Sequence, residues 1–178
     1  PDGKVTGLRA RGGFEVSLQP WYSAAYGSAW YGRGGVLVVA NIRGGGEYGP
    51  GWHQAALKAS RQTSYDDFAA VAEDLIRARI TSPAHLGIAG GSNGGLLVGA
   101  VMLQRPELFG AVASSVPLLD MRRYHRLLAG ASWMAEYGDP DQPEDWAVIE
   151  RYSPYHNVRP GMALPLVSYG GSALVVTL

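Results

Sequence analysis

The chain has 178 residues, with 15 Lys plus Arg, 15 Asp plus Glu, a formal net charge of zero and no cysteine. Its 47% hydrophobic and 17% charged residues exclude a disordered segment, and the neutral balance without a basic cluster argues against binding to nucleic acid or to an anionic membrane. Without cysteine there is no disulfide framework, thiolate metal site or cysteine nucleophile.

The first residues of the sequence show no recognisable targeting signal. The chain begins at Pro1 without Met, a basic segment or an apolar segment, so no signal peptide is visible. Two stretches without charged residues, 80–104 and 160–178, are interrupted by glycines and prolines and do not read as membrane spans. We therefore expect a soluble, cytoplasmic protein whose length allows one domain of ordinary size.

Two segments of the N-terminal part have the pattern of β-strands. Residues 14–18, Phe-Glu-Val-Ser-Leu, alternate in polarity and predict a short strand. Residues 35–42 form a continuous apolar run rich in valine, which is typical of a strand buried on both faces of a parallel sheet. A glycine-rich loop, 43–51, follows this run.

Residues 64–80 predict an amphipathic helix. Ser64, followed three residues later by Asp67, resembles a capping box at the start of this helix. The spacing of the apolar residues indicates one buried face. That face consists of Tyr65, Phe68, Val71, Ala72, Leu75 and Ile76.

The central part of the chain alternates between strands and helices. Residues 85–90 and 111–116 predict buried strands, and 93–104 predict the helix between them. This order is typical of an α/β protein with a parallel sheet. Near the end, 164–167 predict a further strand, and 170–178 predict a hairpin that begins at a glycine pair.

The pentapeptide 90–94, Gly-Gly-Ser-Asn-Gly, fits the pattern Gly-x-Ser-x-Gly. Between a strand and a helix, this pattern is a nucleophile elbow, in which a sharp turn exposes the hydroxyl of Ser92 and directs the main-chain N–H of Asn93 toward an oxyanion. The alternative is a glycine-rich turn with an incidental serine. A phosphate-binding loop is disfavoured because Gly-Lys-Ser/Thr is missing.

Several longer stretches carry a more specific similarity. They are residues 12–18, 40–49, 52–53, 65–68, 90–96, 104–109, 133–138 and 152–158. With these stretches the chain closely resembles the catalytic domain of the prolyl oligopeptidase family of serine peptidases, over about residues 12–159. The resemblance implies an α/β-hydrolase fold, a mostly parallel sheet flanked by helices, and cleavage of short peptides after proline through an acyl-enzyme.

The resemblance also implies roles for individual residues. Ser92 matches the nucleophile, and the main-chain N–H of Asn93 matches one oxyanion donor. Trp133 matches the indole that stacks on the substrate proline, and Phe14 and Tyr137 match further members of that pocket. Aromatic packing suits proline, which offers a flat apolar ring and no N–H. From the residues alone, the favoured interpretation of Trp133 is an ordinary core tryptophan.

The chain departs from the family pattern at position 11. The family uses a tyrosine hydroxyl directly before the Gly-Gly-Phe stretch as its second oxyanion donor, whereas this chain has Arg11. An arginine can donate hydrogen bonds, but it is longer and carries a full charge. Loss of an oxyanion donor costs on the order of 10²–10³ in rate. The segment before Gly12 also looks unlike the family.

The catalytic triad is incomplete in the sequence. In this fold the chain order is Ser, then Asp, then His, and the family's Asp and His fall at or beyond the end of these 178 residues. None of the four histidines, His53, His85, His125 and His156, matches the catalytic one. A substitute triad of His156 with an acid preserves the order but has little support, because geometry defines a triad. The candidate acids are Asp139, Asp141 and Asp145.

Two hypotheses follow. The first is that residues 1–178 are part of a peptidase catalytic domain, truncated at its C-terminus and without the family's N-terminal β-propeller. We expect this peptidase to act on small peptides as a monomer. A sister peptidase with basic or broader specificity is a variant of this hypothesis. The second is a catalytically incomplete pseudo-hydrolase or frameshifted fragment. No cofactor is expected, and no His, Asp or Glu group has a clear metal-ligand spacing.

Overall fold

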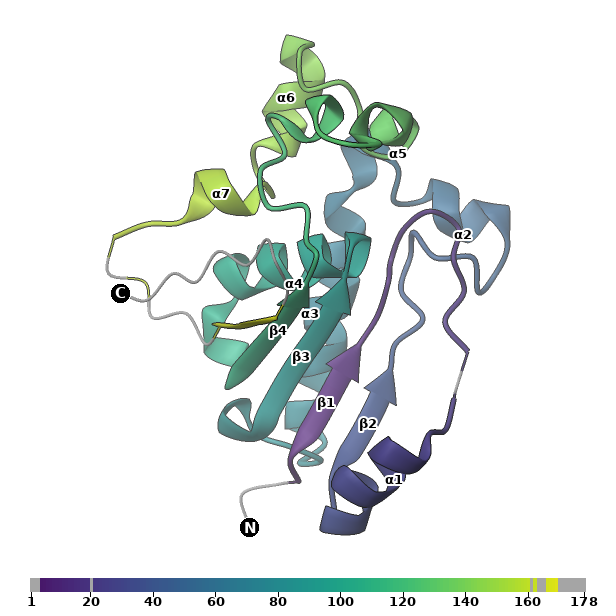
Figure 1. Ribbon diagram of the computed structural model, residues 1–178, viewed down its shortest axis with the longest axis vertical. Helices are drawn as coiled ribbons and strands as arrows, with labels where there is room; N and C mark the ends of the chain where they lie inside the picture. Colours follow the sequence, from purple (N-terminus) through teal and green to yellow (C-terminus); the bar gives the residue numbers. More distant parts are fainter. Residues whose placement is uncertain (1–3, 20, 161, 163–165, 170–178) are drawn as a thin grey trace.

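A computed structural model describes residues 4–19, 21–160, 162 and 166–169 of the chain. The described strands form one parallel sheet in the order β2-β1-β3-β4-β5 (Figure 1). The strands are β1 (Thr6–Arg9), β2 (Val36–Val39), β3 (Leu86–Gly91), β4 (Ala111–Ser115) and β5 (Leu166–Tyr169). The helices are α1 (Ala24–Ala29), α2 (Pro50–Gln54), α3 (Gln62–Arg77), α4 (Asn93–Gln104), α5 (Met134–Tyr137), α6 (Pro143–Ile149) and α7 (Pro154–Asn157).

The N-terminal strand lies elsewhere than the sequence predicts. Residues 14–18 form a turn and loop, so the predicted strand there is wrong. The strand is β1, which lies between β2 and β3, with Leu8 opposite Val38 and Ile88. Phe14 cannot continue a strand, because its φ of 59° is left-handed. The segment before Gly12 is therefore part of the sheet.

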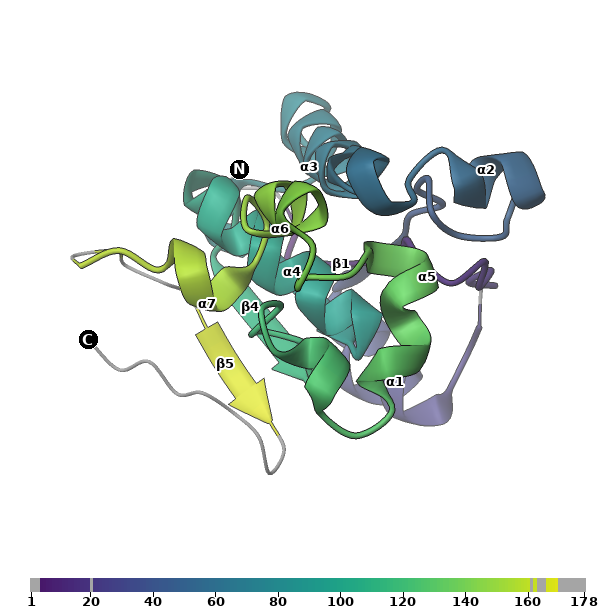
Figure 2. The same cartoon turned by 90° about the horizontal axis from the view of Figure 1, so that it is seen from above.

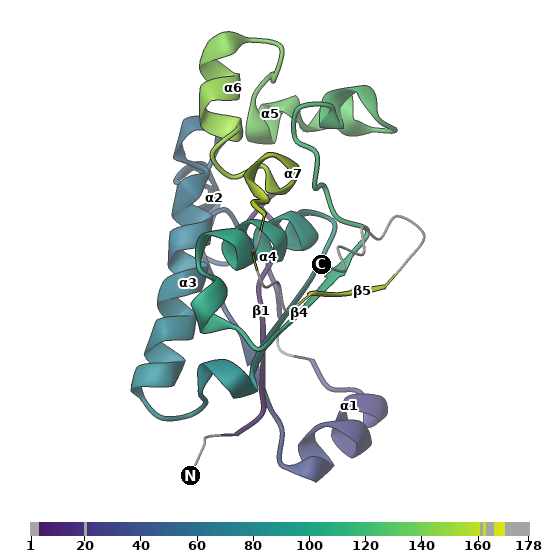
Figure 3. The ribbon, with the colours of Figure 1, turned by 90° about the vertical axis from the view of Figure 1, so that its left-hand side faces the viewer.

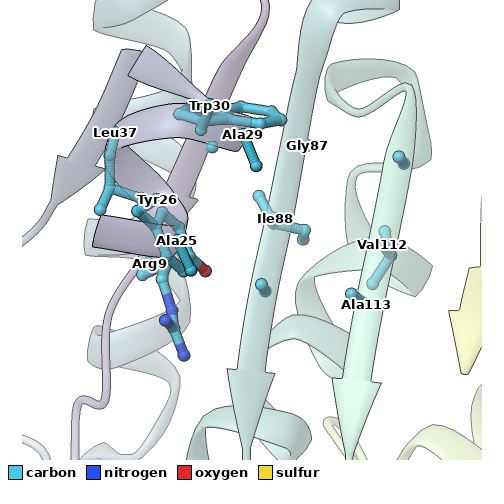
Figure 4. A pocket seen from close by; sticks show the side chains of 13 residues that line it. Arg9, Ala25, Tyr26, Ala29, Trp30, Leu37, Gly87, Ile88, Val112 and Ala113 are labelled. Atoms are coloured by element: carbon cyan, nitrogen blue, oxygen red, sulfur yellow. The ribbon is translucent and has the colours of Figure 1, made fainter. Parts of the chain in front are cut away.

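Helices α3 and α4 cover one face of the sheet, and α1 lies on the other (Figure 3). Burial alternates along β3 and β4, and Leu86, Ile88 and Val112 are among the buried residues of the core. The prediction of a strand buried on both faces is wrong for β2, since all four of its residues are partly exposed. Between α1 and the sheet lies an apolar hollow of about 470 Å³, lined by residues such as Trp30 and Leu37 (Figure 4).

Helix α3 confirms the predicted amphipathic helix but not its ends. It starts two residues before Ser64, whose hydroxyl instead donates to the carbonyl oxygens of Gly12 and Arg43, so the predicted capping box is wrong. The helix stops at Arg77, before the predicted Ile80, because Arg79 adopts a φ of 58° and the chain reverses. The N–H of Ile80 then donates to the carbonyl of Leu75, as in a Schellman motif.

The central strands and α4 agree closely with the predicted pattern. Helix α4 spans Asn93–Gln104, as predicted, and β3 and β4 lie within one residue of the predicted bounds. The predicted strand near the C-terminus is observed as β5, which pairs with β4 in parallel. The predicted hairpin over 170–178 lies outside the described residues.

The short helices α5, α6 and α7 lie beyond the carboxyl ends of the strands (Figure 1). Seen from above, this group covers α4 and the end of the sheet (Figure 2). Ligand sites in open parallel sheets form at this end of the strands. No helix in the described part of the chain is long and apolar enough to cross a membrane.

Candidate active site

Ser92 lies on a sharp turn between a central strand and a helix. Strand β3 ends at Gly91, Ser92 has φ 54° and ψ −117°, and α4 begins at Asn93. A left-handed φ is unfavourable for a residue with a side chain, and such strain persists where the surrounding structure enforces it. Here the Ser92 N–H donates to the carbonyl of Ser115 on β4 at 3.0 Å.

Gly90 is required for this turn. A Cβ atom at position 90 would lie 2.0 Å from the main-chain oxygen of Gly94, so no larger residue fits without moving the backbone. The close approach brings the first turn of α4 against the end of β3. As the first residue of α4, Asn93 has a main-chain N–H that the helix itself does not use. The predicted elbow geometry is therefore present.

The partly exposed Ser92 lines a cavity of about 300 Å³ at the end of the sheet. Two cations, Arg9 and Arg11, line the same cavity, together with Trp21 and Val116. Among the described residues, the Nε atom of Arg11 is buried and has no hydrogen-bond partner. Because both arginines are positively charged, an anionic group in this cavity would be favoured.

The three aromatic residues that the family resemblance singles out lie together. The ring centroids of Phe14 and Trp133 are 6.5 Å apart, and those of Phe14 and Tyr137 are 5.7 Å apart, both in edge-to-face contact. Phe14 and Trp133 are partly exposed, whereas Tyr137 is buried. None of the three rings lines the cavity beside Ser92, so the aromatic cluster is a neighbouring surface.

The side chain of Asn93 joins the elbow to this aromatic cluster. Its Oδ1 accepts from the Tyr137 hydroxyl at 2.6 Å, and its Nδ2 donates to the main-chain oxygen of Arg11 at 2.5 Å. Burial raises the pKa of the Tyr137 phenol far above its ordinary value, so the hydroxyl keeps its proton. Asn93 thus contributes to two places: its main-chain N–H lies at the elbow, and its buried side-chain amide is hydrogen-bonded to Tyr137 of the aromatic cluster.

A buried ion pair completes this network. Arg61, which is fully buried, donates from Nη1 to Glu136 Oε1 at 2.8 Å and from Nη2 to Asn93 Oδ1 at 2.6 Å. Glu136 also accepts from the Phe14 N–H at 2.9 Å and lies 2.7 Å from Nε2 of His53. Burial lowers the pKa of Arg61, but the electrostatic interactions with its neighbours outweigh this effect and raise it, so the guanidinium is charged.

The sequence did not indicate the roles of Arg61, Glu136 and His53. Arg61 precedes α3 and Glu136 lies within α5, 75 positions later in the chain, so no local pattern links them. The signals were the family-like stretches 52–53 and 133–138, which contain His53 and Glu136.

The four histidines each have a hydrogen-bond partner other than Ser92. His53 contacts Glu136, His85 contacts Ser82, His125 contacts Asp141 and His156 contacts Ser153. Within the described part of the chain, no hydrogen bond joins the Ser92 side chain to a histidine. The substitute triad therefore gains no support, because His156 bonds to Ser153 and packs against Trp146.

Among the described residues, one group of possible metal ligands is present. Ligand atoms of His125, Asp139 and Asp141 lie within 4.8 Å of one another, a grouping that the sequence did not predict. Arg126, however, donates to both carboxylate oxygens of Asp141. These oxygens are already engaged by a cation, and the group is far better described as an ion-pair cluster.

The fold and the elbow together define a class of protein. A parallel sheet flanked by helices, with a serine in the left-handed turn between a central strand and the next helix, is the α/β-hydrolase arrangement. Comparison with known proteins specifies the family. The Prolyl oligopeptidase family profile matches residues 21–173, most of the chain. The chain belongs to this family, whose members are serine peptidases.

Individual relatives agree with this assignment. The chain is 58% identical over 158 residues to an uncharacterised peptidase of Sinorhizobium fredii, covering 89% of this chain and 22% of that protein. It is 43% identical to a prolyl endopeptidase of Elizabethkingia meningoseptica, covering 99% of this chain and 24% of that protein. A solved post-proline cleaving enzyme from Rickettsia typhi superposes with a TM-score of 0.91 at 53% identity. The match covers 93% of this chain and 24% of that chain.

These comparisons add two facts. The chain spans about a quarter of the length of the relatives it matches. The family match runs from residue 21 to residue 173. Strand β5, which pairs with β4 in parallel, lies within this range.

Proposed function

We propose that this chain is part of a serine peptidase that cleaves short peptides after proline. The observation that carries the proposal is the elbow at Ser92 beside the aromatic cluster of Phe14, Trp133 and Tyr137. Partly exposed rings in edge-to-face contact offer a site for a flat apolar proline ring. The printed names of the prolyl endopeptidase and of the post-proline cleaving enzyme support the same substrate class.

In the proposed reaction, Ser92 Oγ attacks the carbonyl carbon of the proline residue and passes its proton to a base. The main-chain N–H of Asn93 donates to the oxyanion of the tetrahedral intermediate. The C–N bond then breaks, the leaving amine takes the proton, and an acyl-enzyme remains until water hydrolyses it. Since the four histidines are engaged elsewhere, we propose that the base and its acid partner come from the rest of the full-length gene product.

We further propose that Arg11 supplies the second oxyanion donor. Arg11 lines the Ser92 cavity, and its Nε has no hydrogen-bond partner among the described residues. The positive charge of the guanidinium would favour a developing oxyanion, and a guanidinium nitrogen would donate to it. Arg11 would then serve where the family has a tyrosine.

The alternative is a catalytically incomplete protein, in which Ser92 lacks a base and stays a weak nucleophile. A serine-directed fluorophosphonate probe, applied to the full-length gene product, separates the two. We expect labelling at Ser92, identified by mass spectrometry and absent in Ser92→Ala. Absence of labelling in the wild type favours the incomplete protein.

Specificity needs a second measurement. Peptide anilides that differ only in the residue before the scissile bond, Pro, Ala or Arg, are compared by kcat/KM. We expect the proline substrate to be preferred. Preference for arginine would instead favour the variant with basic specificity, and labelling without cleavage of any anilide would contradict the peptidase proposal.

A further inference from the structure

The buried pair of Arg61 and Glu136 lies behind the proposed site and takes no part in the reaction just described. The Arg61 side chain is fully buried and that of Glu136 is 5% exposed. Burying two charges is expensive and often gives no more stability than apolar residues of similar size. Stability alone therefore does not account for this pair, whereas its contacts on both sides indicate a second role.

Arg61 reaches the elbow. One of its nitrogens donates to Glu136, and the other donates to Asn93 Oδ1 at 2.6 Å. The guanidinium is rigid and planar, so fixing one end on a carboxylate also fixes the direction of the other. Asn93 carries the proposed oxyanion donor on its main chain. The orientation of that residue therefore depends in part on Arg61.

Glu136 reaches the aromatic cluster. Its Oε1 accepts from the N–H of Phe14 at 2.9 Å, and its neighbour Tyr137 belongs to the same helix, α5. Phe14 and Glu15 both have left-handed φ values, 59° and 54°. Two consecutive strained residues need external contacts to keep their conformation, and the carboxylate of Glu136 is one such contact.

We propose that Arg61 and Glu136 are positioning residues that hold the oxyanion donor at Asn93 and the proline pocket at Phe14 in one fixed relation. Neither residue touches substrate in this proposal, which rests on the function proposed above. A single buried ion pair thus couples the chemistry of the elbow to the recognition of the proline ring.

The test uses two conservative variants in the full-length gene product. Arg61→Lys keeps the charge but has one nitrogen, so it cannot bind Glu136 and Asn93 in the same planar fork. Glu136→Gln keeps the shape and removes the charge. Asp67→Asn is the matched control, because it breaks a different Arg–carboxylate pair, between Asp67 on α3 and Arg43. In the described part of the chain, the hydrogen bonds of Asp67 are to Arg43 and not to Asn93 or Phe14.

Four readouts are compared, each below the melting temperature of the variant: kcat, KM, the labelling rate and the preference for proline over alanine. For Arg61→Lys we expect kcat and the fluorophosphonate labelling rate to fall about 100-fold, the size of effect that misplacement of a reacting group produces, with KM little changed. For Glu136→Gln we expect in addition a loss of preference for proline over alanine. The control Asp67→Asn is expected to keep wild-type kcat.

The outcomes are distinguishable. If both variants are folded and keep wild-type kcat and selectivity, the pair is only structural and the inference is overturned. If the wild type itself is inactive, the proposed function fails, and calorimetric binding of the product peptide acetyl-Ala-Pro decides the inference. Glu136→Gln should then weaken binding about tenfold; unchanged affinity, or no binding by any form, overturns it.

Discussion

At the scale of single residues, Asn93 serves two parts of the molecule. Its main-chain N–H lies at the start of α4, where helix N-termini favour negative charge. Its side-chain amide is buried and accepts hydrogen bonds from both Arg61 and Tyr137. A substitution of either partner should therefore alter the orientation of Asn93 at the elbow.

Arg11 gives the first prediction. Arg11→Met removes the guanidinium and keeps much of the length of the side chain. In the full-length gene product we expect kcat/KM for a proline anilide to fall about 10²-fold, because one oxyanion donor is lost. Unchanged kinetics would show that Arg11 does not contact the oxyanion. Arg9→Met, in the same cavity, is the control for a loss of positive charge alone.

Gly13 gives the second prediction. A Cβ atom at this position would lie 2.6 Å from Asn93 Nδ2 and 2.9 Å from Arg61 Nη2. Gly13→Ala should therefore push the Asn93 amide away from its partners and lower the rate of fluorophosphonate labelling at Ser92. Gly51→Ala is the comparison, since a Cβ there meets nothing within 4 Å. Equal labelling of the two variants would contradict the proposed packing.

At the scale of elements, α3 is tied to the loop after β2 by Asp67. This carboxylate accepts from the main-chain N–H and from the guanidinium of Arg43. Burial raises its pKa, but the hydrogen bonds from Arg43 outweigh this and lower the pKa below the ordinary value of 3.8. The pair therefore stabilises the fold above that pH, and the contribution is lost as the pH falls through the lowered pKa.

The third prediction follows from the lowered pKa of Asp67. Asp67→Asn should lower stability at pH 7 by about 1 kcal/mol or less, because Arg43 is largely solvent-screened. The difference from the wild type should shrink as the pH falls below about 4. Thermal denaturation at pH 7, 5 and 3 measures both effects. A constant difference across this range would exclude titration of Asp67 as its source.

At the scale of the whole molecule, the two faces of the sheet differ. Helices α3 and α4 bury one face, whereas the hollow beside α1 leaves apolar side chains accessible on the other (Figure 4). An accessible apolar surface favours association. The fourth prediction is that the 178-residue chain, produced alone, binds a hydrophobic dye and self-associates.

A substitution in the hollow tests this prediction. Ala113 on β4 is exposed and lines the hollow. Ala113→Lys should reduce both dye binding and the apparent mass in analytical ultracentrifugation. A monomeric wild-type chain without dye binding would contradict the prediction.

The sequence by itself determined the features that depend on neighbouring residues. Periodicity placed α3, and the order of apolar runs and punctuating residues placed β3, α4 and β4, because burial of one face follows from local spacing. The elbow at Ser92 was predictable for the same reason, since its glycines, strand and helix are contiguous. Strand β1 was missed because its four residues carry no distinctive alternation, and its place beside β2 and β3 arises from pairing.

Only the tertiary structure decided how distant residues meet. The contact of Arg61 with Glu136, the hydrogen bond of Tyr137 to Asn93 and the edge contact of Phe14 with Trp133 all join different elements. The exposure of β2 likewise depends on what packs against it. Local spacing specifies which face of an element is apolar, but the partner on that face is set by the folded chain.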